Sequence, residues 1–142
     1  MNQALEPYEM TVAVQPGDID QLGHVNNIAY LRWVQDIAVV HWKKFAALAD
    51  QAELAWVVLR HEIDYKRPAY IEDEVIARTW VGTASGIRFV RFTELLRGGD
   101  RSVLAKARTV WCPIDRKTGN PTIVSQHVRE HFSNPASLPE DT

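Results

Sequence analysis

One long apolar segment limits the folds open to this chain more than any other feature. Across residues 27–49, large apolar side chains recur at intervals of three and four, which is the spacing of one helical face. The face is formed by Leu31, Val34, Ala38, Trp42 and Phe45, and it is widened by Tyr30, Trp33, Ile37 and Val40. A surface helix keeps a broad polar side. We therefore predict that the rest of the chain encloses this helix.

The remaining segments predict a sheet that performs the enclosing. Apolar and polar residues alternate with the period of a half-buried strand in five runs: residues 8–14, 59–65, 74–81, 87–96 and 102–111. The links between later runs are short, as at Gly98-Gly99-Asp100, which favours antiparallel pairing. Ser125 is suited to cap one short helix through Phe132. The predicted fold is α+β, with an antiparallel five- or six-stranded sheet wrapped around one long central helix.

Length and composition predict one soluble domain. The chain has 142 residues, of which 46% are hydrophobic and 24% charged, as in ordinary globular proteins. We place a single domain at residues 1–132 and expect a flexible tail at 133–142. A net charge of -2 gives no reason to expect nucleic acid or an anionic membrane as partner. Without an apolar run of the ~20 residues that cross a bilayer, and without a secretory leader, the expected location is cytoplasmic.

The densest polar segment comes directly before the predicted helix. It is DIDQLGHVNNIAY, residues 18–30. The first N–H groups of a helix lack intrahelical acceptors and carry the positive end of its dipole, so they can hold an oxygen that gains negative charge. Asn26 or Asn27 is suited to cap the helix, and Gly23 lets the backbone turn or a ligand approach closely. Asp20, a few residues upstream, can supply an acid-base group that faces those donors.

The pattern D-x-D-x-x-G-H-V-N-N-x-x-Y at residues 18–30 resembles the active-site segment of hotdog-fold acyl-CoA thioesterases of the 4-hydroxybenzoyl-CoA thioesterase type. Weaker similarity continues through IDYKRPAY at 63–70 to about residue 132. The resemblance implies the hotdog fold and hydrolysis of an acyl-CoA thioester without metal or bound cofactor. It also implies a homodimer or homotetramer whose pockets lie at the subunit interface.

The resemblance also implies roles for particular residues. The second aspartate of the family motif acts as nucleophile or general base, which corresponds to Asp20, and a main-chain N–H at the helix start polarises the thioester carbonyl, which corresponds to Asn27. His24 is the third catalytic candidate, although we favour a structural role in which it orients the loop by hydrogen bonding its backbone. The candidate substrate-binding residues are Gly23, Asn26, Tyr30, Ser85, Gly86 and Arg88.

Several features allow more than one interpretation. The coenzyme A phosphates would suit a basic surface, or the same residues form a solvated sheet face: Lys66, Arg67, Arg88, Arg91, Lys106 and Arg108. Four large aromatic residues either shape an acyl pocket or fill the core: Trp33, Trp56, Trp80 and Phe89. His127 and His131 have the spacing of two metal ligands, but the sequence places no third ligand beside them. The alternative functions are a non-catalytic acyl-CoA-binding module and a hydroxyacyl dehydratase on the same fold.

Overall fold

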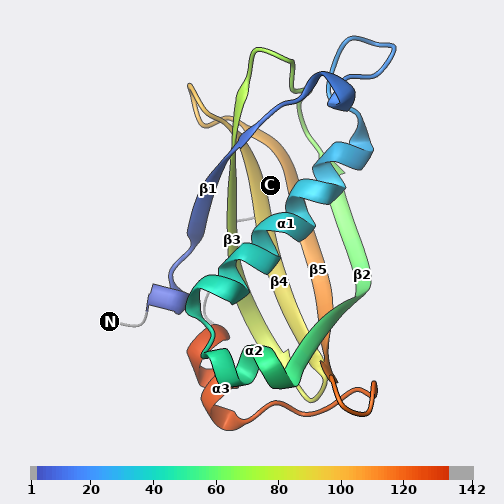
Figure 1. Cartoon of the computed structure of the whole chain (residues 1–142). Helices are drawn as coiled ribbons and strands as arrows, with labels where there is room; N and C mark the ends of the chain where they lie inside the picture. Colours follow the sequence, from blue (N-terminus) through green and yellow to red (C-terminus); the bar gives the residue numbers. More distant parts are fainter. Residues whose placement is uncertain (1–2, 135–142) are drawn as a thin grey trace.

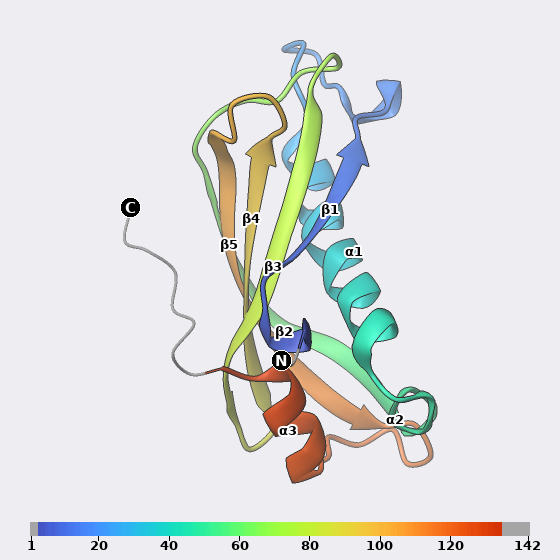
Figure 2. The same ribbon diagram turned by 90° about the vertical axis from the view of Figure 1, so that its left-hand side faces the viewer.

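The computed structural model describes residues 3–134 of the chain. Its sheet contains β1 (Tyr8–Ala13), β2 (Leu54–Tyr65), β3 (Glu74–Ser85), β4 (Arg88–Arg97) and β5 (Val103–Asp115). These five strands pair antiparallel in the order β1-β3-β4-β5-β2. Helix α1 (Asn27–Phe45) lies along one face of the sheet (Figures 1 and 2). The predicted α+β class is confirmed, and residues 135–142 of the predicted tail lie outside the described part.

Burial of α1 follows its sequence pattern. Its buried residues are Ala29, Tyr30, Trp33, Val34, Ile37, Ala38 and His41. The N-terminal half of the helix packs on small and branched side chains that alternate toward it along the strands, among them Val75, Ala77, Leu95 and Ala105. Small residues on the strands let the bulky helix lie close to the sheet, so the wide apolar face is covered as predicted.

The predicted helix is too long at its C-terminal end. α1 stops at Phe45 because Ala46 is extended, with φ -77° and ψ 145°. The Gln51 side-chain amide then donates to the carbonyls of Lys43 and Ala46, at 3.1 and 2.9 Å, and so satisfies acceptors that a helix end leaves open. A short helix, α2 (Leu48–Glu53), follows. The cap comes from a side chain beyond the helix, which the apolar spacing does not reveal.

Three strands are longer than predicted: β3 continues beyond residue 81 to Ser85, and β2 and β5 are extended together. β2 begins at Leu54 rather than at residue 59, and β5 continues to Asp115, because residues 54–58 pair with residues 111–115. Apolar side chains occupy both faces in this region, so the alternation that marks a half-buried strand is missing. The predicted short helix is confirmed as α3 (Gln126–Phe132), whose cap Ser125 accepts a hydrogen bond from the Val128 N–H at 3.3 Å.

The two ends of the sheet carry different loops. Ala13 pairs with Glu74 at the start of β3, whereas Ser85, at the other end of β3, pairs with Arg88. Twelve strand residues separate these ends, a span of roughly 36 Å at about 3.3 Å per residue. The segment before α1 therefore lies at one end and the β3–β4 turn at the other, as Figure 1 shows. None of the described helices is long and apolar enough to span a membrane.

Two basic side chains are buried between α1 and the sheet. Nη1 of Arg91 donates to Nδ1 of His41 at 3.0 Å and to Oγ1 of Thr79 at 3.2 Å. Nε2 of His41 donates to the carbonyl of Ala4 at 3.1 Å, which completes its hydrogen bonding. Burial, and then the adjacent Arg91 charge, lower the pKa of His41 to about 3. His41 is thus a neutral core residue whose proton sits on Nε2.

This buried histidine predicts a pH-dependent stability. Because its pKa falls from 6.5 in the unfolded chain to about 3 in the folded chain, only the unfolded chain takes up the proton between these values. The free energy of unfolding should therefore decrease as pH falls through this window, by up to about 1.4 kcal/mol per pH unit. His41→Gln keeps a donor and an acceptor but does not titrate. In urea unfolding, the stability difference between wild type and His41→Gln should change between about pH 6 and about pH 4; a constant difference would contradict the assignment.

Candidate active site

The N-terminus of α1 offers two unclaimed donors. Asn26 is the cap, with Oδ1 accepting from the N–H of Ala29 at 2.8 Å. Within the described residues, the N–H groups of Asn27 and Ile28 have no acceptor, and both residues are exposed. These two N–H groups lie at the positive end of the helix dipole. The geometry suits an oxygen that develops negative charge.

A small hairpin leads into this helix end. Ile19 pairs with Val25, the Asp20 N–H donates to the carbonyl of His24 at 3.0 Å, and the Gly23 N–H donates back to the carbonyl of Asp20 at 3.0 Å. Gly23 has φ +84°, a conformation that side chains with a Cβ rarely adopt. Gly23 thus closes the turn. Asp20 and His24 face each other across it.

The two candidate catalytic side chains lie together at the mouth of this hairpin. Nδ1 of His24 is 3.7 Å from Oδ2 of Asp20, and the two side chains are 33% and 31% exposed. Oδ1 of Asp20 accepts the Leu22 N–H at 2.9 Å, which fixes the carboxylate rotation. Oδ2 is left for His24 or for a bound molecule. A carboxylate that is held on one oxygen and accessible on the other is suited to accept a proton from water.

Asp18 holds the base of the hairpin. Its carboxylate is buried, accepts from Nη2 of Arg32 at 2.6 Å, and accepts from the Gln15 N–H at 2.9 Å. Burial opposes ionisation, but the hydrogen bonds from Arg32 and Gln15 outweigh it and keep the Asp18 pKa below its usual value. The Asp18 carbonyl also accepts the Asn26 N–H at 2.8 Å. Arg32 is not among the predicted site residues, because nothing in the local sequence links it to a residue fourteen positions upstream.

Tyr30 anchors the loop from below. Its hydroxyl accepts the Ala69 N–H at 3.0 Å and reaches the carbonyl of Arg67 at 3.4 Å. The Ala69 carbonyl in turn accepts the Val25 N–H at 2.8 Å. Burial raises the pKa of Tyr30 and keeps the phenol protonated. These contacts account for the position of the Tyr30 side chain without any contact to a substrate. Its predicted role in substrate binding stays a prediction.

The other predicted substrate contacts lie far from Asp20 within one chain. Ser85, Gly86 and Arg88 form the exposed β3–β4 turn, where Gly86 has φ +59°. That turn is at the end of the sheet opposite the segment before α1 (Figure 1). The structure thus brings Asp20, Gly23, His24 and Asn27 into one loop and helix start but leaves the turn separate. Only a second chain can bring the turn near Asp20.

The basic residues do not form one surface. Arg91 points into the core, whereas two of the other basic residues pair with acids: Nζ of Lys106 is 3.9 Å from Oε2 of Glu94, and Nη1 of Arg108 is 3.3 Å from Oε1 of Glu62. Arg91 on β4 pairs with Thr109 on β5. Because successive residues of a strand face opposite sides of the sheet, Lys106 and Arg108 lie on the face opposite to Arg91. Among residues 3–134, no three His, Cys, Asp or Glu side chains gather as a metal site.

Comparison with known proteins identifies the family. A family model described as the thioesterase-like superfamily matches residues 14–141. The chain belongs to the thioesterase-like superfamily. A search of curated proteins gave no match.

Solved structures share the fold of this superfamily member. The PA5185 protein of Pseudomonas aeruginosa is 21% identical, with a TM-score of 0.79 and 88% of each chain covered. A Thermus thermophilus thioesterase crystallised with coenzyme A and zinc is 23% identical, with a TM-score of 0.74, covering 87% of this chain and 90% of that one. A Synechocystis 1,4-dihydroxy-2-naphthoyl-CoA thioesterase is 18% identical, with a TM-score of 0.76 and coverage of 94% and 98%. At these identities the likeness shows the fold, which is the hotdog fold that the sequence predicts.

The anchoring role of Tyr30 predicts a stability loss. Tyr30→Phe removes the acceptor of the Ala69 N–H, at a residue with 0% exposure, while it keeps the ring in the core. The expected cost is about 1–3 kcal/mol in the free energy of unfolding, measured by urea denaturation. Tyr70→Phe, in the adjacent segment and 39% exposed, should change it by less than about 0.5 kcal/mol. Equal effects of the two changes would refute the anchoring role.

Proposed function

We propose that this protein hydrolyses the thioester bond of an acyl-CoA. The observation that carries the proposal is the pair of unclaimed N–H groups, on Asn27 and Ile28, beside a hairpin that holds the half-exposed Asp20. In a superfamily described as thioesterase-like, a carboxylate beside helix N–H donors has the parts that acyl transfer to water requires.

The proposed reaction uses Asp20 in one of two ways. As general base, it accepts a proton from water while the water oxygen bonds to the thioester carbon. The N–H groups of Asn27 and Ile28 hold the carbonyl oxygen as it becomes an oxyanion, the C–S bond then breaks, and Asp20 gives its proton to the leaving thiolate. As nucleophile, Asp20 bonds to the carbon and expels the thiolate, and water cleaves the resulting mixed anhydride. His24, whose Nδ1 is 3.4 Å from the Val25 carbonyl and 3.7 Å from Oδ2 of Asp20, orients the loop in either case.

We also propose that the working unit is a homodimer or homotetramer. β2 pairs only with β5 within the described residues, so its other edge is open. Val57, Leu59 and Tyr65 on this strand are 43%, 47% and 44% exposed, an unusual amount of apolar surface for an open edge. Antiparallel pairing of two β2 edges would turn the β3–β4 end of one chain toward the Asp20 end of the other. Ser85, Gly86 and Arg88 would then contact substrate across the interface.

Replacing Asp20 tests the chemistry. Asp20→Asn keeps an oxygen for the Leu22 N–H but cannot serve as base or nucleophile, so kcat for acyl-CoA hydrolysis should fall by at least ~100-fold. A panel of short, long and aromatic acyl-CoAs is assayed for free thiol. Asp36→Asn, an exposed aspartate on α1, is the matched control and should retain wild-type turnover.

Three results would contradict the proposal. Near-normal turnover in Asp20→Asn, with unchanged circular dichroism, would remove Asp20 from the mechanism. Acyl-CoA binding without thiol release in the wild type would favour the non-catalytic binding module instead. Hydration of enoyl-CoA, monitored in parallel, would favour the dehydratase.

The open edge predicts a charge-sensitive assembly. Leu59 lies at the register shift in β2 and is 47% exposed, so Leu59→Glu would place a charge within the proposed contact. Light scattering after size-exclusion chromatography should show the oligomer of the wild type and a monomer of the variant. Leu48→Glu, on α2 and 83% exposed, should leave the mass unchanged. An unaltered oligomer in Leu59→Glu would place the interface elsewhere.

A further inference from the structure

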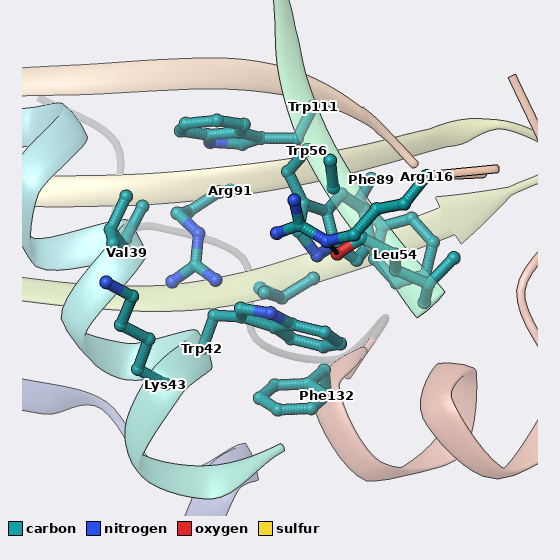
Figure 3. A pocket seen from close by; sticks show the side chains of 13 residues that line it. Val39, Trp42, Lys43, Leu54, Trp56, Phe89, Arg91, Trp111, Arg116 and Phe132 are labelled. Atoms are coloured by element: carbon teal, nitrogen blue, oxygen red, sulfur yellow. Dashed lines mark hydrogen bonds between the residues drawn. The ribbon is translucent and has the colours of Figure 1, made fainter. Parts of the chain in front are cut away.

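A cavity lies beneath the C-terminal half of α1. It has a volume of about 230 Å³, and it is bounded by α1, β2, β3, β4, β5 and α3 (Figure 3). Arg91, which lines it, contacts His41, and His41 is fourteen residues along α1 from Asn27. At about 1.5 Å per residue this is about 21 Å from the helix N-terminus. The cavity is therefore separate from the Asp20 loop of the same chain.

The charges that line this cavity all have one sign. Lys43, Arg91 and Arg116 contribute to its wall, and no aspartate or glutamate does. The remaining wall is apolar and largely aromatic: Trp42, Trp56, Phe89, Trp111 and Phe132. A low-dielectric wall strengthens the field of the cations inside it. The cavity is thus suited to an anion with an apolar body.

Arg91 is the cation placed deepest. Its side chain reaches from β4 toward α1, where Trp42 and Lys43 project (Figure 3), and the residue is 7% exposed. Its two hydrogen-bond acceptors, His41 and Thr79, are uncharged. Within the described residues, Nε and Nη2 have no acceptor, although they carry three of the five guanidinium N–H groups. A buried cation without a counter-charge is costly, and an anion in the cavity would relieve that cost.

Two indole N–H groups add further donors. Nε1 of Trp56 and Nε1 of Trp111 are buried without an acceptor among the described residues, and both tryptophans line the cavity. Buried indole N–H groups normally have an acceptor. The wall thus has an excess of donors and a deficit of acceptors, which a ligand with acceptor oxygens would correct.

We propose that this cavity binds a small apolar carboxylic acid in its ionised form, with the carboxylate on Arg91 and the apolar body against the aromatic wall. Size supports a single ring with a short arm, since an engineered cavity of about 150 Å³ in another protein holds benzene and this one is about 230 Å³. The inference goes beyond the proposed function. It does not depend on thioester cleavage, because binding of a free acid breaks no bond.

Equilibrium titration of the full chain with phenylacetate tests the inference. Phenylacetamide has the same shape without the charge, so phenylacetate should bind at least about tenfold more tightly by calorimetry. Arg91→Met should remove this preference. Arg108→Met, an exposed arginine on β5, is the matched control and should keep it.

A second variant keeps the test decisive if Arg91→Met does not fold. Ala55 lines the cavity from β2 and is partly exposed, so Ala55→Leu reduces the space without changing a charge. It should weaken phenylacetate binding by about tenfold or more. The inference is overturned if phenylacetate does not bind, if acid and amide bind equally, or if folded Arg91→Met or Ala55→Leu binds like the wild type. None of these outcomes bears on Asp20→Asn turnover, so the two proposals fail independently.

Discussion

Enclosure of one broadly apolar helix is the constraint on which the rest of the structure depends. α1 has residues from Ala29 to His41 buried against the sheet, and that packing fixes both its axis and its ends. A helix held by its side chains still leaves its first N–H groups unpaired. Because the helix begins where the sheet ends, these donors emerge at the surface beside a loop. The location of the candidate site is thus a consequence of how the core is filled.

Most polar residues before α1 serve to hold that loop in shape. Asp18 pairs with Arg32, and Asn26 caps the helix. Tyr30 secures the neighbouring backbone at Ala69, which in turn holds Val25. After these contacts are assigned, Asp20 retains an accessible carboxylate oxygen, and two N–H groups retain no acceptor. The high density of polar side chains is therefore mainly support, and the proposed chemistry rests on the few groups that the support leaves unpaired.

The sequence predicts features that short-range physics determines and misses those set by distant contacts. Apolar spacing and a cap at Asn26 or Asn27 place the start of α1 correctly, and the structure shows that Asn26 is the cap. Its end is missed because Gln51, beyond the helix, supplies the cap. Alternation predicts that successive residues of one strand face opposite sides of the sheet, but it does not relate one strand to the next. Only the register between β4 and β5 shows that Arg91 faces the core while Lys106 lies on the other face and pairs with Glu94. The separation of Ser85 from Asp20 likewise depends on sheet order, which composition and spacing do not determine.

The two ends of α1 lie beside groups that would attract different kinds of negative charge. At the N-terminus, Asn27 and Ile28 are exposed, so water can satisfy their N–H groups in the absence of the reacting oxygen that we propose. Beneath the C-terminal half, Arg91 is only 7% exposed, and its neighbour His41 is neutral and cannot balance its charge. A methionine or leucine would fill that space without the desolvation cost of an ion. A transient negative oxygen suits the first end, whereas a permanent anion suits the second, because only a lasting charge offsets a lasting cost.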